Sequence, residues 1–242
     1  MLFKISGITI PSNYPTLTYH NTSKCSPVSC HTDCFNIELV NSFKYLGVHL
    51  DTNLNWKTHV TNLKYYLTSA ARIIYLLRGL CPVSVLKMVY YALVMAKMEY
   101  GLSCWGGCYP TTLNPLFVQQ KMILRTLLRK PRNESSWHLF KSSKILPLKH
   151  LYVYKVLRVF FKRSGQHIIR LDERYNFRAN HQLLYSIPRF NNNHFRRYIF
   201  VTFFNSLPDS VRRQFRAKPF LSLVKNWLFE RSDITYLVRV VT

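Results

Sequence analysis

The stretch at residues 43–60, FKYLGVHLDTNLNWKTHV, constrains the fold most, because its apolar spacing changes from strand-like to helical within a few positions. Phe35–Leu39 and Phe43–Leu50 are predicted to be two strands, joined by a tight connection at 40–42 into an antiparallel hairpin. After the polar residues 51–55, apolar side chains recur every three or four positions, which predicts an amphipathic helix ending near Gly79. These side chains are Val60, Leu63, Leu67, Ala70, Ile74 and Leu77.

Three further apolar stripes with helical spacing follow this first one. The second begins after Pro82 and contains Leu86, Val89, Leu93, Ala96 and Tyr100. The third contains Leu113, Leu116, Gln120, Ile123 and Leu127. The fourth, opened by Pro147, contains Leu148, Leu151, Tyr154, Leu157 and Phe161.

The remaining segments are shorter or polar. Residues 1–10 have strand-like content, 11–27 and 165–193 are predicted to be loops, and 195–207 and 219–230 are predicted to be short helices. The expected fold class is therefore α+β and predominantly α-helical: a short N-terminal antiparallel hairpin, then a helix bundle, then a basic helical C-terminal region. The expected divisions are 1–54, 55–130 and 131–242.

Positive charge is concentrated after the β region. The chain has 34 Lys and Arg against 10 Asp and Glu, and residues 1–60 hold only four of the basic and three of the acidic ones. A folded domain with such an excess repels itself and gains free energy when it meets a polyanion. The composition therefore favours nucleic acid as a partner, with an anionic membrane surface or a merely solubilising charge as alternatives.

The membrane alternative lacks a spanning segment in the sequence. The most apolar region, residues 73–105, is interrupted by Arg78, Pro82, Lys87, Lys97 and Glu99, so it contains no run of about 18 uncharged residues. The first twelve residues do not resemble a signal peptide. We expect an intracellular protein, in the nucleus or cytoplasm, that is neither secreted nor transmembrane.

Cysteine and histidine residues near the N-terminus raise the question of zinc. Five of them lie within fifteen residues: His20, Cys25, Cys30, His31 and Cys34. Structural zinc sites bring paired ligands on two separate knuckles, and this segment has no second knuckle, so a polar loop is favoured and no metal site is predicted. Cys81, Cys104 and Cys108 lie in or beside apolar helical stretches and are predicted to be small buried residues.

No catalytic constellation stands out. The sole adjacent acidic pair, Asp172-Glu173, lies between Arg170 and Arg174, which is typical of a solvated turn. No Gly-rich phosphate loop and no nucleophile elbow is found. From its residues alone, the chain is predicted to be a binding protein.

The opening stretch also carries a family resemblance. SFKYLGVHLDTNLNWKTHV at 42–60 resembles the segment after the polymerase active site in reverse transcriptases of non-LTR, LINE-type (jockey-like) retrotransposons. Shorter pieces resemble the same family in the same order: residues 1–3, 37–40, Tyr100-Gly101 with Trp105-Gly106, 119–125 and 204–212 (FNSLPDSVR). The resemblance is strongest at 42–60 and weaker beyond 130.

The resemblance implies an incomplete polymerase. Family members copy RNA into DNA with palm-domain aspartates that hold two Mg²⁺ ions, and this sequence contains no Asp-Asp pair. Residues 1–54 would be the edge of the palm, 55–130 a thumb, and 131–242 a C-terminal extension. Such a chain would bind RNA and DNA as a template–primer duplex, would need no cofactor of its own, would not polymerise alone, and would associate with a polypeptide that supplies the rest of the polymerase.

The same resemblance suggests site residues. The primer-grip-like positions would be Tyr45, Leu46 and Gly47. Phosphate contacts would come from basic residues of the hairpin and thumb, through charge rather than base reading. These are Lys44, Lys57, Lys64, Arg72, Arg78, Lys121, Arg125, Arg129 and Lys130. The alternative hypothesis is a basic helical module that docks on nucleic acid or protein and has no role in copying.

Overall fold

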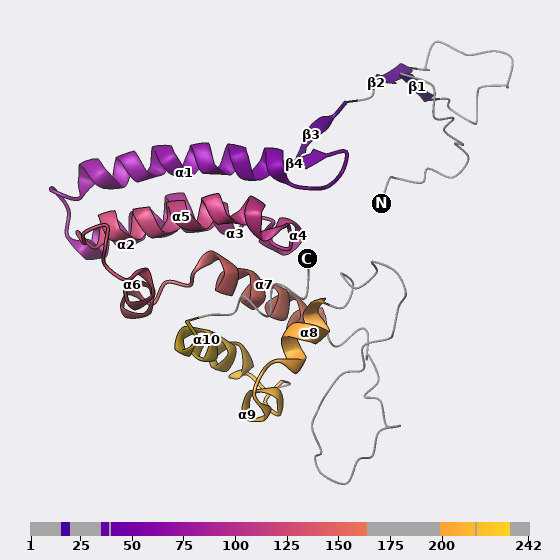
Figure 1. Cartoon of the computed structure of the whole chain (residues 1–242). Helices are drawn as coiled ribbons and strands as arrows, with labels where there is room; N and C mark the ends of the chain where they lie inside the picture. Colours follow the sequence, from indigo (N-terminus) through magenta and orange to yellow (C-terminus); the bar gives the residue numbers. More distant parts are fainter. Residues whose placement is uncertain (1–15, 20–34, 39, 164–198, 216, 233–242) are drawn as a thin grey trace, which may run out of the picture. The chain divides into compact units, whose positions relative to one another are not determined.

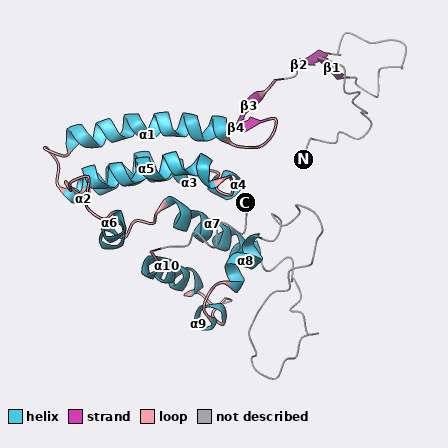
Figure 2. Cartoon of the chain, viewed as in Figure 1, coloured by secondary structure: helices cyan, strands magenta, loops and turns pink. Residues whose placement is uncertain are grey.

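The structure is a computed structural model that describes residues 16–19, 35–38, 40–163, 199–215 and 217–232. The chain divides into two compact units, 1–54 and 55–242, and each is described by itself. The predicted strand at 1–10 and the predicted loop at 165–193 lie outside the described residues. The predicted loop at 11–27 is wrong at Thr16–Tyr19, which form a strand, and the rest of it lies outside the described residues. The predicted fold class is confirmed: a largely helical chain with short antiparallel β pairs near its N-terminus (Figure 2).

The first unit contains two separate two-stranded sheets. Strand β1 (Thr16–Tyr19) pairs antiparallel with β2 (Phe35–Glu38), and β3 (Ser42–Tyr45) pairs antiparallel with β4 (Val48–Asp51). The prediction that Phe35–Leu39 pairs with Phe43–Leu50 is therefore wrong. The second of these segments is not one strand but a complete hairpin.

A two-residue turn at Leu46-Gly47 explains the difference. Both residues have positive φ, 46° and 82°, which is the requirement of a type I′ hairpin turn whose twist matches that of the strands. Glycine adopts this conformation readily, whereas leucine rarely does. Leu46 lies in an apolar run of the sequence, so hydrophobic content alone predicts one continuous strand there and no turn.

The second unit is a helical assembly (Figure 1). Its helices, in chain order, are α1 (Lys57–Leu77), α2 (Val83–Val89), the π-helical η1 (Tyr90–Met95), α3 (Ala96–Glu99), α4 (Leu102–Trp105), α5 (Pro110–Leu127), α6 (Ser136–Ser143), α7 (Leu148–Arg163), α8 (Ile199–Asn205), α9 (Asp209–Arg212) and α10 (Phe220–Glu230). The predicted helices match α1, the continuous stretch α2–η1–α3, α5, α7, α8 and α10, while α4, α6 and α9 were not predicted.

The buried stripes of α1 and α5 are the predicted ones. In α1 the predicted positions Val60, Leu63, Leu67, Ala70 and Ile74 are buried and Leu77 packs at the edge of the core, and all five predicted positions of α5 are buried. The two helices lie side by side (Figure 1). Their mutual burial follows directly from the helical periodicity of the sequence.

The second stripe is correct as far as Leu93, because Val89 and Leu93 pack against the core at its edge, and it fails after that. Leu86 is buried, but Ala96 and Tyr100 are exposed, while Tyr90, Val94, Met95 and Met98 fill the core instead. The π turn of η1 places one extra residue in the helical ladder, so the buried face rotates after residue 89. A fixed 3.6-residue period therefore predicts the wrong face beyond this point.

One hydrophobic core continues through the second unit, from Val60 in α1 to Leu228 in α10. Its C-terminal part is a cluster of phenylalanine rings contributed by α7, α8 and α10 and the segment between α9 and α10. Ring centroids lie 5.1 Å apart for Phe160 and Phe215, 4.9 Å for Phe204 and Phe215, and 5.0 Å for Phe215 and Phe220. The helices after residue 131 thus pack on the same core as the helices before it.

Candidate nucleic-acid interface

The contact between α1 and α5 creates a seam that runs along both helices. Residues from the first turns of α1 and α5 line one groove, and residues from later turns of both helices line a second groove. The two helices therefore lie side by side with their starting ends together. Both helices turn their apolar stripes into the core, which leaves polar and basic side chains along the outer edge of the seam. The seam therefore carries a set of accessible cations contributed by both helices.

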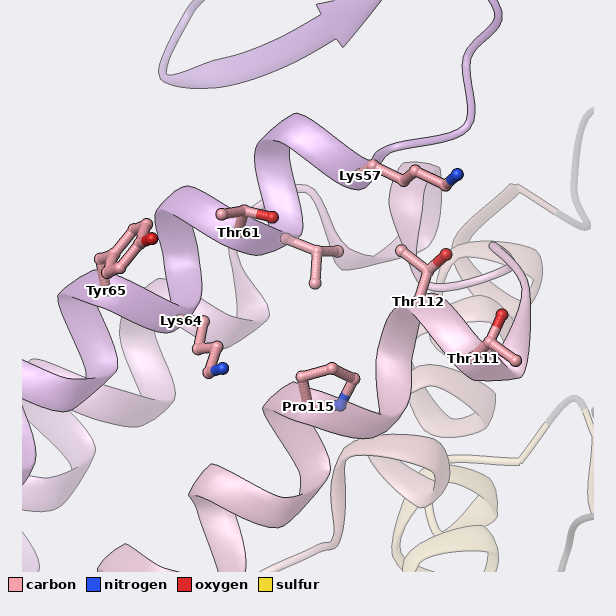
Figure 3. A pocket seen from close by; sticks show the side chains of 8 residues that line it. Lys57, Thr61, Lys64, Tyr65, Thr111, Thr112 and Pro115 are labelled. Carbon is pink, nitrogen blue, oxygen red and sulfur yellow. The ribbon is translucent and has the colours of Figure 1, made fainter.

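The first groove lies where the two helices begin (Figure 3). It has a volume of about 380 Å³ and is lined by Lys57, Val60, Thr61, Lys64, Tyr65, Thr111, Thr112 and Pro115. Two ammonium groups and three hydroxyl-bearing threonines thus share one depression. These are the donor types that bind phosphate oxygens.

The two lysines of the first groove are fixed in spacing by α1. The helix begins at Lys57, whose backbone N–H donates to Asn55 Oδ1 over 2.9 Å, as a capping side chain does. Lys64 follows two turns later on the same side of the helix, roughly 10 Å along the axis. Neither lysine has an ion-pair partner for its side chain within the described part of the chain.

The second groove lies further along the same seam. Its volume is about 790 Å³. It is lined by Thr68, Ala71, Arg72, Tyr75, Leu76, Arg78, Gln119, Met122, Arg125, Thr126, Lys130 and Arg132. Four arginines and one lysine surround side chains that are mainly apolar. Arg132 was not among the predicted residues, although the basic run at 129–132 pointed to it.

The two grooves together collect six of the nine predicted basic residues. Lys57 and Lys64 line the first, and Arg72, Arg78, Arg125 and Lys130 line the second. The other three lie elsewhere. Lys44 is in β3, in the first unit; Lys121 has its ammonium group 4.5 Å from the centre of the Phe117 ring; and Arg129 lies just beyond the C-terminal end of α5.

Two of the arginines hold backbone carbonyl groups. Arg129 donates through Nη2 to the carbonyl oxygens of Arg78, at 2.6 Å, and Cys81, at 3.0 Å. Arg125 donates through Nε and Nη2 to the Glu134 carbonyl oxygen, at 3.2 and 2.9 Å. Both therefore shape the far end of the seam, a role that the sequence did not indicate.

The primer-grip-like residues lie at the tip of the β3–β4 hairpin. Tyr45 and Leu46 are strongly exposed, and Gly47 completes the turn. Lys44 is also exposed. Their role in binding stays a prediction, because they belong to the first unit and the grooves belong to the second.

The Tyr-Gly and Trp-Gly pieces of the family resemblance have structural roles. Gly101 adopts φ 62° ahead of α4, and the buried Trp105 donates through Nε1 to the Tyr100 carbonyl oxygen over 2.9 Å. Gly106 packs so closely on Tyr152 of α7 that a Cβ there would clash with the ring. Trp105 and Gly106 thus serve the packing of this turn in the core and against α7.

The segment at 204–212 is likewise a structural junction. Phe204 and Leu207 are buried, and the turn after them starts α9. The buried guanidinium of Arg212 donates to the Asn205 carbonyl oxygen at 3.0 Å and pairs with Asp209. Arg212 and Asp209 are thus used to close the turn between α8 and α9.

Buried polar groups also connect α5 to α7. The Gln120 amide is fully buried: its Nε2 donates to Tyr90 Oη and to the Leu146 carbonyl oxygen, both at 3.1 Å, and its Oε1 accepts from the Leu148 N–H at 2.8 Å. Burial raises the pKa of the Tyr90 phenol, an effect that the hydrogen bond from Gln120 partly offsets. The Lys155 ammonium of α7 pairs with Glu99 of α3.

The acidic residues of the described chain do not fit a magnesium site. Glu99, Glu134 and Asp209 are each paired with a lysine or arginine. No group of three His, Cys, Asp or Glu side chains that could hold a metal forms in the described ranges. No reaction step through Mg²⁺ is therefore derived for this chain.

The three cysteines of the second unit differ in exposure. Cys108 is buried as predicted, Cys81 is half-buried, and Cys104 is exposed. The prediction for Cys104 is wrong because α4 is a single short turn whose buried side is occupied by Leu102 and Trp105.

Comparison with known proteins supports the resemblance seen in the sequence. The chain is 27% identical, over 124 residues, to the RNA-directed DNA polymerase from mobile element jockey of Drosophila melanogaster. The chain thus has distant homology to a LINE-type reverse transcriptase. The match covers 46% of this chain and 14% of that polymerase, so the chain spans a small part of its relative's length.

Two other comparisons found no counterpart. No protein-family model matches the sequence, and no solved structure matches it. In the described ranges, none of the helices combines the length and apolar character needed to cross a bilayer.

Proposed function

We propose that this chain binds the backbone of an RNA/DNA or primer–template duplex, as a thumb-like part of a LINE-type reverse transcriptase that does not polymerise by itself. The observation that carries the proposal is the first groove, where two lysines with no acidic partner in the described part of the chain sit among threonine hydroxyls. Charge of this kind binds phosphates without reading sequence. Distant homology to a LINE polymerase supports the choice of nucleic acid over other polyanions.

The proposal assigns roles to the three segments. Residues 1–54 would be the edge of a palm, 55–130 the thumb, and 131–242 an extension that braces the thumb through α7. A polypeptide that supplies the catalytic carboxylates would complete the enzyme in the nucleus or cytoplasm. The missing Asp-Asp pair, and the engagement of Glu99, Glu134 and Asp209 in ion pairs, support the lack of activity in this chain alone.

Binding to a short RNA/DNA hybrid, measured over a range of salt concentrations, tests the duplex contact. The variant Lys57→Gln/Lys64→Gln should weaken binding about tenfold at low salt and reduce the salt slope by about two, since each phosphate contact contributes about one unit. Lys141→Gln/Lys218→Gln removes two exposed lysines outside both grooves and is the matched control. An equal loss in both variants would show that only net charge matters.

Nucleotide addition is a separate test. The full chain with a primer–template, deoxynucleotides and Mg²⁺ should give no extension. Any extension that survives purification to homogeneity would contradict the proposed lack of a catalytic centre.

A second candidate function is a basic helical module that docks on another protein. It is favoured by the large apolar side chains that α1 and the turn after it expose, Ile73, Leu76 and Leu80. Duplex binding that is absent, or indifferent to salt, would favour this alternative.

A further inference from the structure

The two grooves of the seam differ in chemistry. The first presents lysines and threonines, whereas the second presents arginines around apolar side chains. We propose that the second groove binds unpaired nucleotides by stacking on their bases, while the first groove holds the backbone of the adjoining duplex. The second site rests on the proposed duplex binding, which it extends to a single-stranded segment.

Apolar surface in the second groove is the first argument. Leu76 is 71% exposed and Met122 is 47% exposed, and both line the groove together with Ala71. A phosphodiester backbone gains nothing from such surface. The faces of unpaired bases do, because stacking removes them from water.

An aromatic ring and a guanidinium are already stacked at this groove. The Arg78 guanidinium carbon lies 4.0 Å from the centre of the Tyr75 ring, and the ring is 54% exposed. Planar guanidinium and aromatic groups are the two platforms on which proteins stack bases without reading their sequence. The pair therefore offers a preformed stack that a base extends.

The groove also has cations for the phosphates between the bases. Arg72 and Arg132 make no side-chain hydrogen bond or ion pair within the residues that the structure describes. Arg125 and Lys130 are partly occupied by Glu134. We therefore assign the phosphate contacts to Arg72 and Arg132.

The two grooves follow one another along the same pair of helices. Lys64 in the first and Arg72 in the second are eight residues apart on α1, roughly 12 Å along the axis. One nucleic-acid strand can therefore pass from duplex to unpaired segment without leaving the seam.

The test uses the full chain and three probes: a blunt RNA/DNA hybrid, the same hybrid with an unpaired oligothymidine tail, and the same hybrid with an abasic tail of equal length. The abasic tail keeps the phosphates and removes the bases. The tail with bases should bind about tenfold more tightly than the abasic tail, the effect of one stacked base. Equal affinity for the two tails overturns the proposal whatever the blunt hybrid does.

Substitutions locate the effect. Tyr75→Ala/Met122→Ala should abolish the preference for bases while leaving affinity for the blunt hybrid unchanged. The matched control is Tyr66→Ala/Met88→Ala: Tyr66 lies on the same helix with the Lys97 ammonium 5.3 Å from its ring, Met88 is exposed, and neither lines a groove. A preference that survives in the first variant, or is lost equally in the control, overturns the assignment.

Other occupants of the groove give different results. Concentration-dependent dimers that disappear in Tyr75→Ala/Met122→Ala would assign the groove to a second copy of the chain and overturn the proposal. An acidic amphipathic peptide would also overturn the proposal if it met two conditions. It would have to displace the unpaired tail without displacing the blunt hybrid, and it would have to bind the wild-type protein more tightly than the tail does. Hybrid binding that is absent at low salt, or that does not fall as the salt concentration rises, refutes the duplex proposal itself.

Discussion

Helix α5 contacts α7 on one side and α1 on the other, and polar side chains are buried at the first junction but exposed at the second. Toward α7, the Gln120 amide is buried and uses both its donor and acceptor atoms. Toward α1, Lys57 and Lys64 lie at the edge of a groove, and their ammonium groups have no ion-pair partner in the described chain. Buried polar groups must be hydrogen-bonded, whereas exposed ones remain available to a ligand.

The difference separates two kinds of residue that look alike in sequence. Gln120, Trp105 and Arg212 are polar or aromatic residues in segments that resemble a polymerase, yet their atoms bond within the fold. The side-chain ammonium groups of the lysines in the first groove make no such bond within the described residues. Substitutions at the α7 junction should therefore reduce stability, and substitutions at the α1 seam should reduce binding.

Gly106→Ala should have the largest effect on the α7 junction. The new Cβ would lie 2.6 Å from the Leu102 carbonyl oxygen and would clash with Tyr152, so overpacking should cost about 2–4 kcal/mol in the free energy of unfolding. Chemical denaturation measures this value. Gly79→Ala is the matched control: no atom lies within 4 Å of its Cβ position, and stability should stay within about 0.5 kcal/mol or rise. Similar losses of stability in Gly106→Ala and Gly79→Ala would show that close packing at Gly106 is not what makes the α7 junction sensitive.

Gln120→Leu should come next. It leaves the Leu148 N–H and the Leu146 carbonyl group without their partner in the core, a loss of about 2–3 kcal/mol. Gln119→Leu is the comparison, because Gln119 lines the second groove and makes no described hydrogen bond. If the two variants unfold at the same denaturant concentration, the buried amide is not what holds α5 to α7.

Arg129→Gln tests a cation that belongs to the seam but acts within the fold. Loss of its bonds to the Arg78 and Cys81 carbonyl oxygens should cost about 1–2 kcal/mol. Lys130→Gln, which removes an exposed lysine next to it, should cost less than about 1 kcal/mol. Thermal unfolding of both proteins measures the difference, and a larger loss for Lys130→Gln would contradict the role given to Arg129.

Alkaline pH gives the smallest effect. Because burial raises the pKa of Tyr90, the folded protein keeps that proton when the unfolded chain has lost it. Its contribution is fully present below the ordinary tyrosine pKa of about 10 and is lost above it, by up to about 1.4 kcal/mol per pH unit. Tyr90→Phe should therefore lose less stability than the wild type between neutral and alkaline pH. Equal losses of stability in the wild type and in Tyr90→Phe would show that groups other than Tyr90 cause the loss at alkaline pH.

The sequence predicted the helices that follow a regular period. The stripes of α1 and α5 are buried as expected because each is an uninterrupted α-helix. The same rule failed at Ala96, where the π turn rotates the helix, and at Leu46, where a leucine adopts a conformation that usually calls for glycine. Both failures are local backbone events that hydrophobic spacing does not record.

The candidate site was predicted in part. The sequence selected most of the basic residues that line the grooves, because it placed them on the helices of the resembling region. It did not show that Arg125 and Arg129 bond to backbone carbonyl groups, or that Arg132 completes the second groove. Those facts depend on which turns of α1, α5 and the following loop come together.

By itself, the sequence determined the helical class of this protein, its excess of positive charge and its likeness to a LINE polymerase. Periodicity, composition and motif order are properties of the chain and need no contacts to be read. The tertiary structure decided which cations face a groove and which close a turn. That choice depends on which backbone groups lie within reach: Arg125 and Arg129 meet carbonyl oxygens of other turns and donate to them. The Lys57 and Lys64 ammonium groups have no ion-pair partner in the described chain, so their charge stays available to a ligand.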